Sequence, residues 1–169
     1  LGLWQYLAGC LPSADVQVFL EKPADIFRDI RGIGEIRSDF PEEPPFDVFF
    51  VLDCAADRLG DAQKYYETAG KTINIDHHVS NTGTGQINHI RPEVGSTCEL
   101  VYDLMEPERL DRDMAMALYV GMIHDTGVFQ YSNTTPATLE KAARLIGHGF
   151  DFPRLIAETF YQKTYVQAQ

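Results

Sequence analysis

Hydrophobic and polar positions follow two different periods along this chain, and the two periods alternate. Short runs that are apolar, or that alternate between apolar and polar residues, predict strands over residues 15–20, 46–52, 71–75 and 86–90. Apolar residues spaced three or four apart predict helices over residues 1–11, 24–31, 57–69, 96–105, 111–124, 136–147 and 152–164. Strands that alternate with helices predict an α/β fold with a mainly parallel sheet flanked by helices.

Three segments carry additional local signals. The run Phe46-Asp-Val-Phe-Phe-Val-Leu52 is nearly continuous in apolar residues, which predicts a strand buried on both faces of a parallel sheet. Thr135 and Pro136 are suited to the N-cap and first position of the helix that follows them. Asp111-Arg-Asp113 is interpreted as a pair of acids that complement the dipole at the start of a helix.

Length and composition limit the organisation of the chain. With 169 residues, 44% of them hydrophobic, we expect one globular domain over residues 1–150, followed by a helix over 151–169. No apolar run approaches the ~20 residues that a membrane span needs, and the first residues lack a signal-peptide pattern. An odd number of cysteines, with no C-x-x-C pair, favours reduced thiols and a cytoplasmic location.

The chain is acidic. Its formal net charge of −11 argues against binding of long nucleic acids, which requires clustered lysine and arginine. A small anionic substrate is compatible with this charge if bound metal ions reverse the local sign.

The clearest candidate chemistry is the triplet Asp76-His77-His78, directly after the strand predicted over 71–75. Open α/β sheets bind their ligands at the carboxyl ends of strands, and imidazole with carboxylate suits Mn²⁺, Fe²⁺ or Zn²⁺. Taken alone, the triplet is equally compatible with a polar loop. However, Asp53 follows the apolar strand and Asp125 follows an apolar helix, so we expect the acidic and imidazole groups to meet in a metal site.

Four segments in a fixed order carry a family resemblance. They are Val51–Gly60, Ile75–Val79, Gly95–Leu100 and His124–Phe129, and the stretch Tyr131–Pro136 follows them. In this order they resemble the successive motifs of the DHH phosphoesterase superfamily. Within it, the chain is most similar to the bacterial nano-RNases, which are oligoribonucleases with phosphoadenosine-phosphate phosphatase activity.

The resemblance implies a phosphodiesterase with two divalent metal ions, usually Mn²⁺, acting on short oligoribonucleotides or nucleotide 3′,5′-bisphosphates. It implies that Asp53 bridges both ions and that His77 and Asp125 are ligands of the second ion. It also implies that His78 faces the substrate phosphate and that Asp76 orients its neighbours. These roles are chemically consistent, since ligating imidazoles need a partner that fixes their tautomer and paired ions stabilise phosphoryl charge.

Two further residues are candidates for substrate binding. Arg58 lies five residues after Asp53, within reach of a substrate phosphate, but a surface arginine at a helix start explains it equally well. Ser96 opens a helix, where hydroxyl and amide groups bind anions. The alternative for Ser96 is a plain N-cap, for which Glu99 would complete a capping box.

The sequence departs from the family pattern at both ends. The family's first motif, a His followed by Asp-x-Asp, does not occur in it, and neither does the glycine-rich motif of the family's second, substrate-binding domain. We therefore expect a fragment in which residues 151–169 lead toward the second domain. We expect this chain alone to have very low activity, and we regard a homodimer as compatible with the sequence.

Other functions remain open at this stage. Within the superfamily they are inorganic pyrophosphatase, polyphosphatase and cyclic-dinucleotide phosphodiesterase. Outside enzymes, the alternative is a degenerate regulatory module that binds a nucleotide without cleaving it. Asp125-Thr-Gly127 also matches an aspartic-protease signature, but that motif expects a preceding strand in an all-β chain and would leave Asp76-His77-His78 unexplained.

Overall fold

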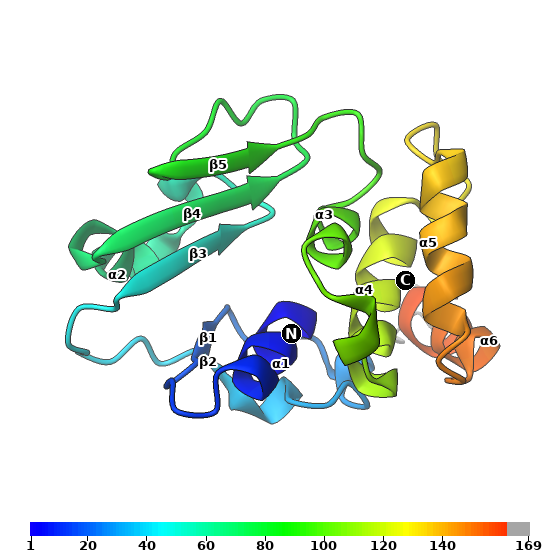
Figure 1. The fold of residues 1–169 in the computed structure, drawn as a ribbon, viewed down its shortest axis with the longest axis horizontal. Helices are drawn as coiled ribbons and strands as arrows, with labels where there is room; N and C mark the ends of the chain where they lie inside the picture. The colour runs from blue at the N-terminus through cyan, green and yellow to red at the C-terminus, as the bar shows by residue number, and fades with distance from the viewer. Residues whose placement is uncertain (162–169) are drawn as a thin grey trace, which may run out of the picture.

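A small parallel sheet lies beside a layer of helices in the computed structural model, which describes residues 1–161 (Figure 1). The strands are β1 (Val18–Phe19), β2 (Ile36–Arg37), β3 (Val48–Leu52), β4 (Lys71–Asp76) and β5 (Ile87–Ile90). The α-helices are α1 (Gly2–Cys10), α2 (Gln63–Thr68), α3 (Thr97–Asp103), α4 (Arg112–Asp125), α5 (Pro136–Ile146) and α6 (Phe152–Leu155). The predicted α/β class with parallel pairing is confirmed.

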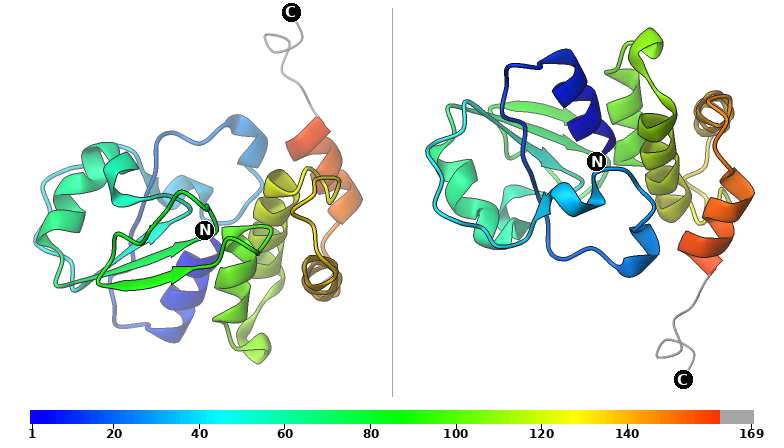
Figure 2. Two further views of the ribbon diagram at one scale, coloured as in Figure 1. Left: turned by 90° about the horizontal axis from the view of Figure 1, so that it is seen from above. Right: turned by 90° about the horizontal axis from the view of Figure 1, so that it is seen from below.

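The register of the larger sheet decides where the strand ends meet. Strands β3, β4 and β5 pair in that order, all parallel, and Leu52 lies opposite Ile75. The residues that follow this pair, Asp53 and Asp76, therefore come together at one edge of the sheet. The carboxyl ends of the strands point toward α3 and α4 (Figure 1), and Figure 2 shows α1 and α2 on opposite sides of the sheet.

Strand β3 is less buried than the apolar run predicted. Val51 is buried, but Val48 and Leu52 are exposed, with 43% and 36% of their surface accessible. The reason is its position, because within residues 1–161 β3 pairs only with β4 and forms an edge of the three-stranded sheet. The prediction of a strand buried on both faces was wrong.

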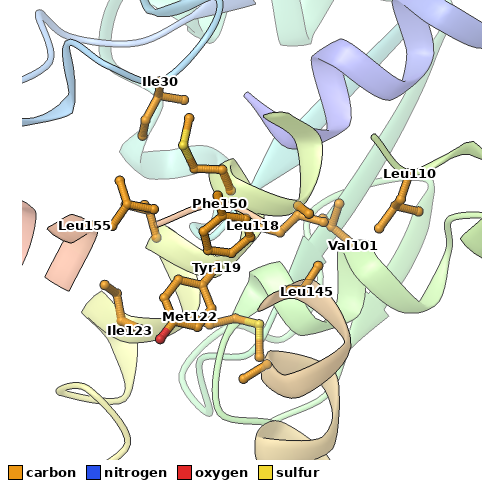
Figure 3. Close-up of a cluster of buried hydrophobic side chains, with 14 of the residues drawn as sticks. Ile30, Val101, Leu110, Leu118, Tyr119, Met122, Ile123, Leu145, Phe150 and Leu155 are labelled. Atoms are coloured by element: carbon orange, nitrogen blue, oxygen red, sulfur yellow. The ribbon is translucent and has the colours of Figure 1, made fainter. Parts of the chain in front are cut away.

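The hydrophobic core lies in the helical layer. Helix α4 packs against α1, α3 and α5, and its side chains Met122 and Ile123 are completely buried. Leu145 of α5 and Tyr119 of α4 lie in the same cluster, together with Phe150 from the loop after α5 (Figure 3). The cap predicted for α5 is present, since Thr135 forms a capping box with Thr138. Asp111, predicted as one of two first-turn acids, is instead the N-cap of α4 and accepts hydrogen bonds from two backbone N–H groups, and Asp113 lies in the first turn.

Several predicted elements are shorter or interrupted. Residues 24–31 form only the 3₁₀ turn Asp25–Phe27, and strand 15–20 is reduced to β1, which pairs with the unpredicted β2. Helix 57–69 begins as two 3₁₀ turns, because Gly60 adopts a left-handed φ of 54° and breaks the α-helical pattern. Helix 152–164 consists of α6 and a π-helical segment, Ile156–Tyr161, and residues 162–164 lie outside the described residues. In the described part of the chain, no helix is long and apolar enough to cross a membrane.

Candidate metal centre

Asp53 leaves the end of β3 in a left-handed conformation. Its φ is 62°, a region that aspartate tolerates better than most residues, and its N–H still donates to the Ile75 carbonyl at 3.0 Å. The Thr97 hydroxyl at the start of α3 donates to Asp53 Oδ1 at 2.8 Å. The carboxylate is thus held between the sheet and the helical layer, with about half of its side chain exposed.

His77 presents one ring nitrogen to the cluster. Its Nδ1 lies 3.2 Å from the Val94 carbonyl oxygen, which can only accept, so Nδ1 carries the proton. The lone pair of Nε2 is then available for a metal ion. Nε2 lies 3.5 Å from Asp53 Oδ1 and 3.9 Å from Asp125 Oδ2, and the side chain is largely buried.

Asp76 is the buried support of the triplet. Its Oδ1 accepts hydrogen bonds from the backbone N–H of His77 at 2.7 Å and of His78 at 3.1 Å, and Asn81 donates to its Oδ2. Burial acts to raise the pKa of Asp76, but the hydrogen bonds from Asn81 and His78 outweigh it, and the pKa is lowered. The side chain is therefore an anion that holds the backbone of both histidines and the ring of His78.

His78 faces outward, with 46% of its side chain exposed. Its Nδ1 lies 2.7 Å from Asp76 Oδ1, and this hydrogen bond raises the pKa of the imidazole despite partial burial. With Nδ1 occupied in this way, Nε2 is the ring nitrogen left for another partner. Protonation of Nε2, which the raised pKa favours, makes it a donor to an anion, such as the substrate phosphate that the sequence predicted.

Asp125 comes from the helical layer, as the last residue of α4. Burial, and after it the charge of Asp53, raises the pKa of Asp125 to about 6. Two carboxylates and an imidazole lone pair thus converge on one space. A divalent cation there would offset both the burial of the carboxylate and the repulsion between the acids.

The structure brings five of the seven predicted residues together. Ligand atoms of Asp53, His77 and His78 lie within 4.8 Å of one another, and Asp125 adjoins them. Asp76 holds the His78 ring through a hydrogen bond. Carboxylate and imidazole donors fit Mn²⁺, Fe²⁺ or Zn²⁺. The chain thus has a candidate metal centre at the strand ends.

The two remaining candidates lie apart from this centre. Arg58 is exposed at the end of the 3₁₀ turn Ala56–Arg58, and no hydrogen bond or ion pair within residues 1–161 joins it to the cluster. Ser96 is completely buried, and its hydroxyl accepts a hydrogen bond from the Glu99 N–H as the N-cap of α3. The predicted substrate contact of Ser96 is therefore not supported by the structure, because a buried side chain presents no surface to a substrate.

Two residues outside the predicted site hold the centre in place, and the sequence assigned neither of them this role. Thr97, next to Ser96, donates to Asp53 as described above. Asn133 donates from Nδ2 to the Gly95 carbonyl at 2.9 Å and to the Asp125 carbonyl at 3.2 Å, so it joins the loop before α3 to the end of α4. Both residues lie in segments that carried the family resemblance, but nothing in their spacing indicated these partners.

Comparison with known proteins gives the family. The DHH family, N-terminal domain, matches residues 1–122, so the chain belongs to the DHH family. It is 35% identical over 88 residues to the bifunctional oligoribonuclease and PAP phosphatase NrnA of Thermus thermophilus, which covers 51% of this chain and 27% of that protein. It is 31% identical over 121 residues to the protein of the same name from Bacillus subtilis, covering 69% of this chain and 38% of the relative.

A solved structure agrees with the fold. The crystal structure of an exopolyphosphatase-related protein from Bacteroides fragilis superposes with a TM-score of 0.85 at 23% identity. The alignment covers 97% of this chain and 52% of that one, so the described architecture corresponds to about half of the neighbour. The matched segments span about a third of the two curated relatives.

Proposed function

We propose that the intact protein is a metal-dependent phosphoesterase that hydrolyses short oligoribonucleotides or nucleotide 3′,5′-bisphosphates. The observation that carries this proposal is the convergence of Asp53, His77 and Asp125, with the Nε2 lone pair of His77 directed at two carboxylates. Membership of the DHH family supports a phosphoesterase, and the names of the two bacterial relatives support the substrate class.

The residues of the candidate centre have different roles in this proposal. Asp53, His77 and Asp125 would provide part of the ligand set of two divalent cations, Mn²⁺ in this proposal, which supply Lewis acidity to the reaction when bound. His78, held by Asp76, donates a hydrogen bond to a phosphoryl oxygen on which negative charge develops. The Val94 carbonyl keeps the His77 ring in the tautomer that leaves Nε2 free.

The test is an assay of the full-length protein with Mn²⁺ against several phosphate compounds. We expect turnover of di- to pentanucleotides and of phosphoadenosine phosphate, and its loss when the metal is removed with a chelator. Preferred turnover of pyrophosphate, polyphosphate or a cyclic dinucleotide would overturn the substrate class. Nucleotide binding without turnover of any of them would favour the regulatory module.

Asp53→Asn tests the site itself. Asparagine tolerates the left-handed backbone at this position and still accepts the Thr97 hydrogen bond, but it removes the negative charge with which Asp53 would hold the metal ions. Because metal ions contribute several kcal/mol to such reactions, we expect turnover to fall at least ~10³-fold. Asp57→Asn, at an exposed position in the same loop, is the matched control and should retain activity. Normal turnover by Asp53→Asn would refute the site.

The cytoplasmic location, the second domain and a homodimer stay predictions from the sequence. Gel filtration of the full-length protein, compared with its mass, tests the homodimer.

A further inference from the structure

Two buried asparagine side chains connect the halves of the candidate metal centre. Asn74 lies on β4, two residues before Asp76, and Asn81 lies in the loop that follows the triplet. Their exposed fractions are 0% and 7%. Buried amides are costly unless their donors and acceptors are satisfied, so their partners show what they hold in place.

Asn81 binds the triplet on one side and the end of β3 on the other. Its Nδ2 lies 2.6 Å from Asp76 Oδ2, 2.9 Å from Asn74 Oδ1 and 3.2 Å from the Cys54 carbonyl oxygen. Its Oδ1 accepts from the Gly83 N–H at 2.9 Å. A single amide group therefore joins Asp76 to the residue directly after Asp53.

Asn74 reaches the same carbonyl from the neighbouring strand. Its Nδ2 donates to the Cys54 carbonyl at 2.9 Å and lies 3.2 Å from the Val51 carbonyl. Its Oδ1 also accepts from the Thr84 hydroxyl at 3.2 Å. The Cys54 carbonyl thus receives hydrogen bonds from both asparagines, and these bonds fix the chain immediately after Asp53.

This arrangement matters because Asp53 has a left-handed backbone. Such a conformation persists only where the surroundings hold it, and here the hydrogen bonds from Asn74 and Asn81 hold the following peptide. The same Asn81 amide fixes Asp76, which in turn orients His77 and His78. The buried amides of Asn74 and Asn81 therefore hold both halves of the cluster in position.

We propose that Asn74 and Asn81 are positioning residues that set the Asp53 carboxylate against His77. A purely structural role predicts something different: loss of the amides would lower stability and leave the cluster geometry of the folded protein unchanged. The metal readout of the test rests on the proposed function, whereas the geometric readout does not.

The test compares Asn81→Ala with two controls in the full-length protein. Asn88→Ala removes the same residue type from an exposed site on β5, where its side chain bonds only to Gly85. Val101→Ala removes buried apolar atoms from the helical core and serves as a control for lost stability. Asn81→Asp, which has nearly the same shape without the donor, is a second variant in case Asn81→Ala does not fold.

Crystal structures of the metal-free proteins give the first readout. In wild type, Asn88→Ala and Val101→Ala, we expect the Asp53 Oδ1 to His77 Nε2 distance to stay near 3.5 Å. In the Asn81 variants we expect Asp53 to be displaced and this distance to increase. An unchanged distance in the Asn81 variants would overturn the proposal.

Calorimetric titration with Mn²⁺ gives the second readout. We expect the affinity of the Asn81 variants to fall by 10-fold or more, since loss of groups that orient metal ligands costs about 10–100-fold, and that of both controls to be retained. A fall in Val101→Ala equal to that in Asn81→Ala would overturn positioning in favour of stability alone. If wild type does not bind Mn²⁺, the proposed function fails, and the crystal structures still decide the positioning claim.

Discussion

The sheet and the helical layer of this protein differ in what they bury: the helical layer encloses a large apolar cluster, and the sheet buries polar side chains beside the apolar Val51 and Ile75. In the helical layer, α4 and its neighbours enclose a cluster of apolar residues that includes Met122, Ile123 and Leu145. In the sheet, the central strand β4 buries Asn74 and Asp76 completely, while the edge strand β3 leaves Val48 exposed. Apolar burial provides most of the stabilisation of a domain, so the helical layer carries stability and the strand ends carry the candidate chemistry.

The candidate centre lies where these two regions meet. Asp125 and Thr97 come from the helical layer, whereas Asp53, His77 and His78 come from the strand ends. Contacts cross between the regions at the centre: the Thr97 hydroxyl lies 2.8 Å from Asp53 Oδ1, and His77 Nε2 lies 3.9 Å from Asp125 Oδ2. We expect substitutions deep in the helical layer to change stability and substitutions at the strand ends to change the chemistry. The following predictions test this separation.

Leu145→Ala should produce the largest loss of stability. The side chain of Leu145 is completely buried in the core cluster, so truncation removes apolar contacts and leaves a cavity that costs about 2–5 kcal/mol. Urea unfolding measures this loss. Leu139→Ala on the same helix is the matched control, because Leu139 is 50% exposed, and it should change stability by less than about 0.5 kcal/mol. Below its unfolding transition, Leu145→Ala should bind Mn²⁺ with wild-type affinity, and a clear loss of affinity would contradict the separation.

His78→Ala should have the converse effect. The ring is half exposed and contacts Asp76, so its removal should leave the free energy of unfolding nearly unchanged. Turnover of the full-length protein should fall about 10²-fold, the effect of removing one donor to a developing charge. Metal analysis should show an unchanged ion content, and loss of an ion would instead make His78 a ligand. His89→Ala, which removes an imidazole from the adjacent strand β5, is the control.

Features that follow from a local pattern could be predicted from the sequence, whereas features that depend on the packing of the whole fold could not. Asp53 and Asp76 follow strand-like runs, and parallel strands bring their carboxyl ends to one edge, so their meeting was predictable. The cap Thr135 acts within one helical turn and was predictable from the local sequence, whereas Asp111 was assigned to the first turn and is the N-cap. The exposure of β3 was not predictable, because being an edge strand is a property of the whole sheet and not of the apolar run.

Ser96 and Thr97 are a second case in which the local sequence could not show which residue contacts the centre. Both hydroxyls open the same helix, and the sequence pattern favoured Ser96 as a candidate contact. Ser96 is the N-cap, with an extended backbone, and its hydroxyl turns back to the Glu99 N–H, whereas Thr97 is the first residue of the helix and reaches Asp53. Which of the two faces the centre depends on how α3 packs against the sheet, and that packing has no signature in the local sequence.

Glu99 is a buried acid within the helical layer, and it gives the smallest predicted effect. Its carboxyl group is buried between α3 and α5, where it accepts a hydrogen bond from the Thr138 hydroxyl at 3.0 Å, and Lys141 Nζ lies 3.8 Å away. Burial raises the pKa of Glu99 above its ordinary value of 4.5, although Thr138 and Lys141 act in the opposite direction. Lys141 keeps a closer partner in Asp103, at 2.6 Å, if the charge of Glu99 is removed.

Glu99→Gln should therefore stabilise the protein slightly at neutral pH. A carboxyl group whose pKa is raised by folding binds its proton more tightly in the folded state, so wild-type stability decreases as pH rises from about 4.5 through the raised pKa. Glutamine keeps an acceptor for Thr138 and has no such pH dependence. The difference in the free energy of unfolding between variant and wild type should be near zero at pH 4 and should grow toward pH 7, reaching about 1 kcal/mol or less. Glu140→Gln, at an exposed position on α5, should show no comparable trend. If Glu99→Gln instead becomes less stable than wild type as pH rises, the ion pair with Lys141 outweighs the cost of burying the carboxylate. The helical layer would then hold a stabilising buried charge, as the sheet does at Asp76.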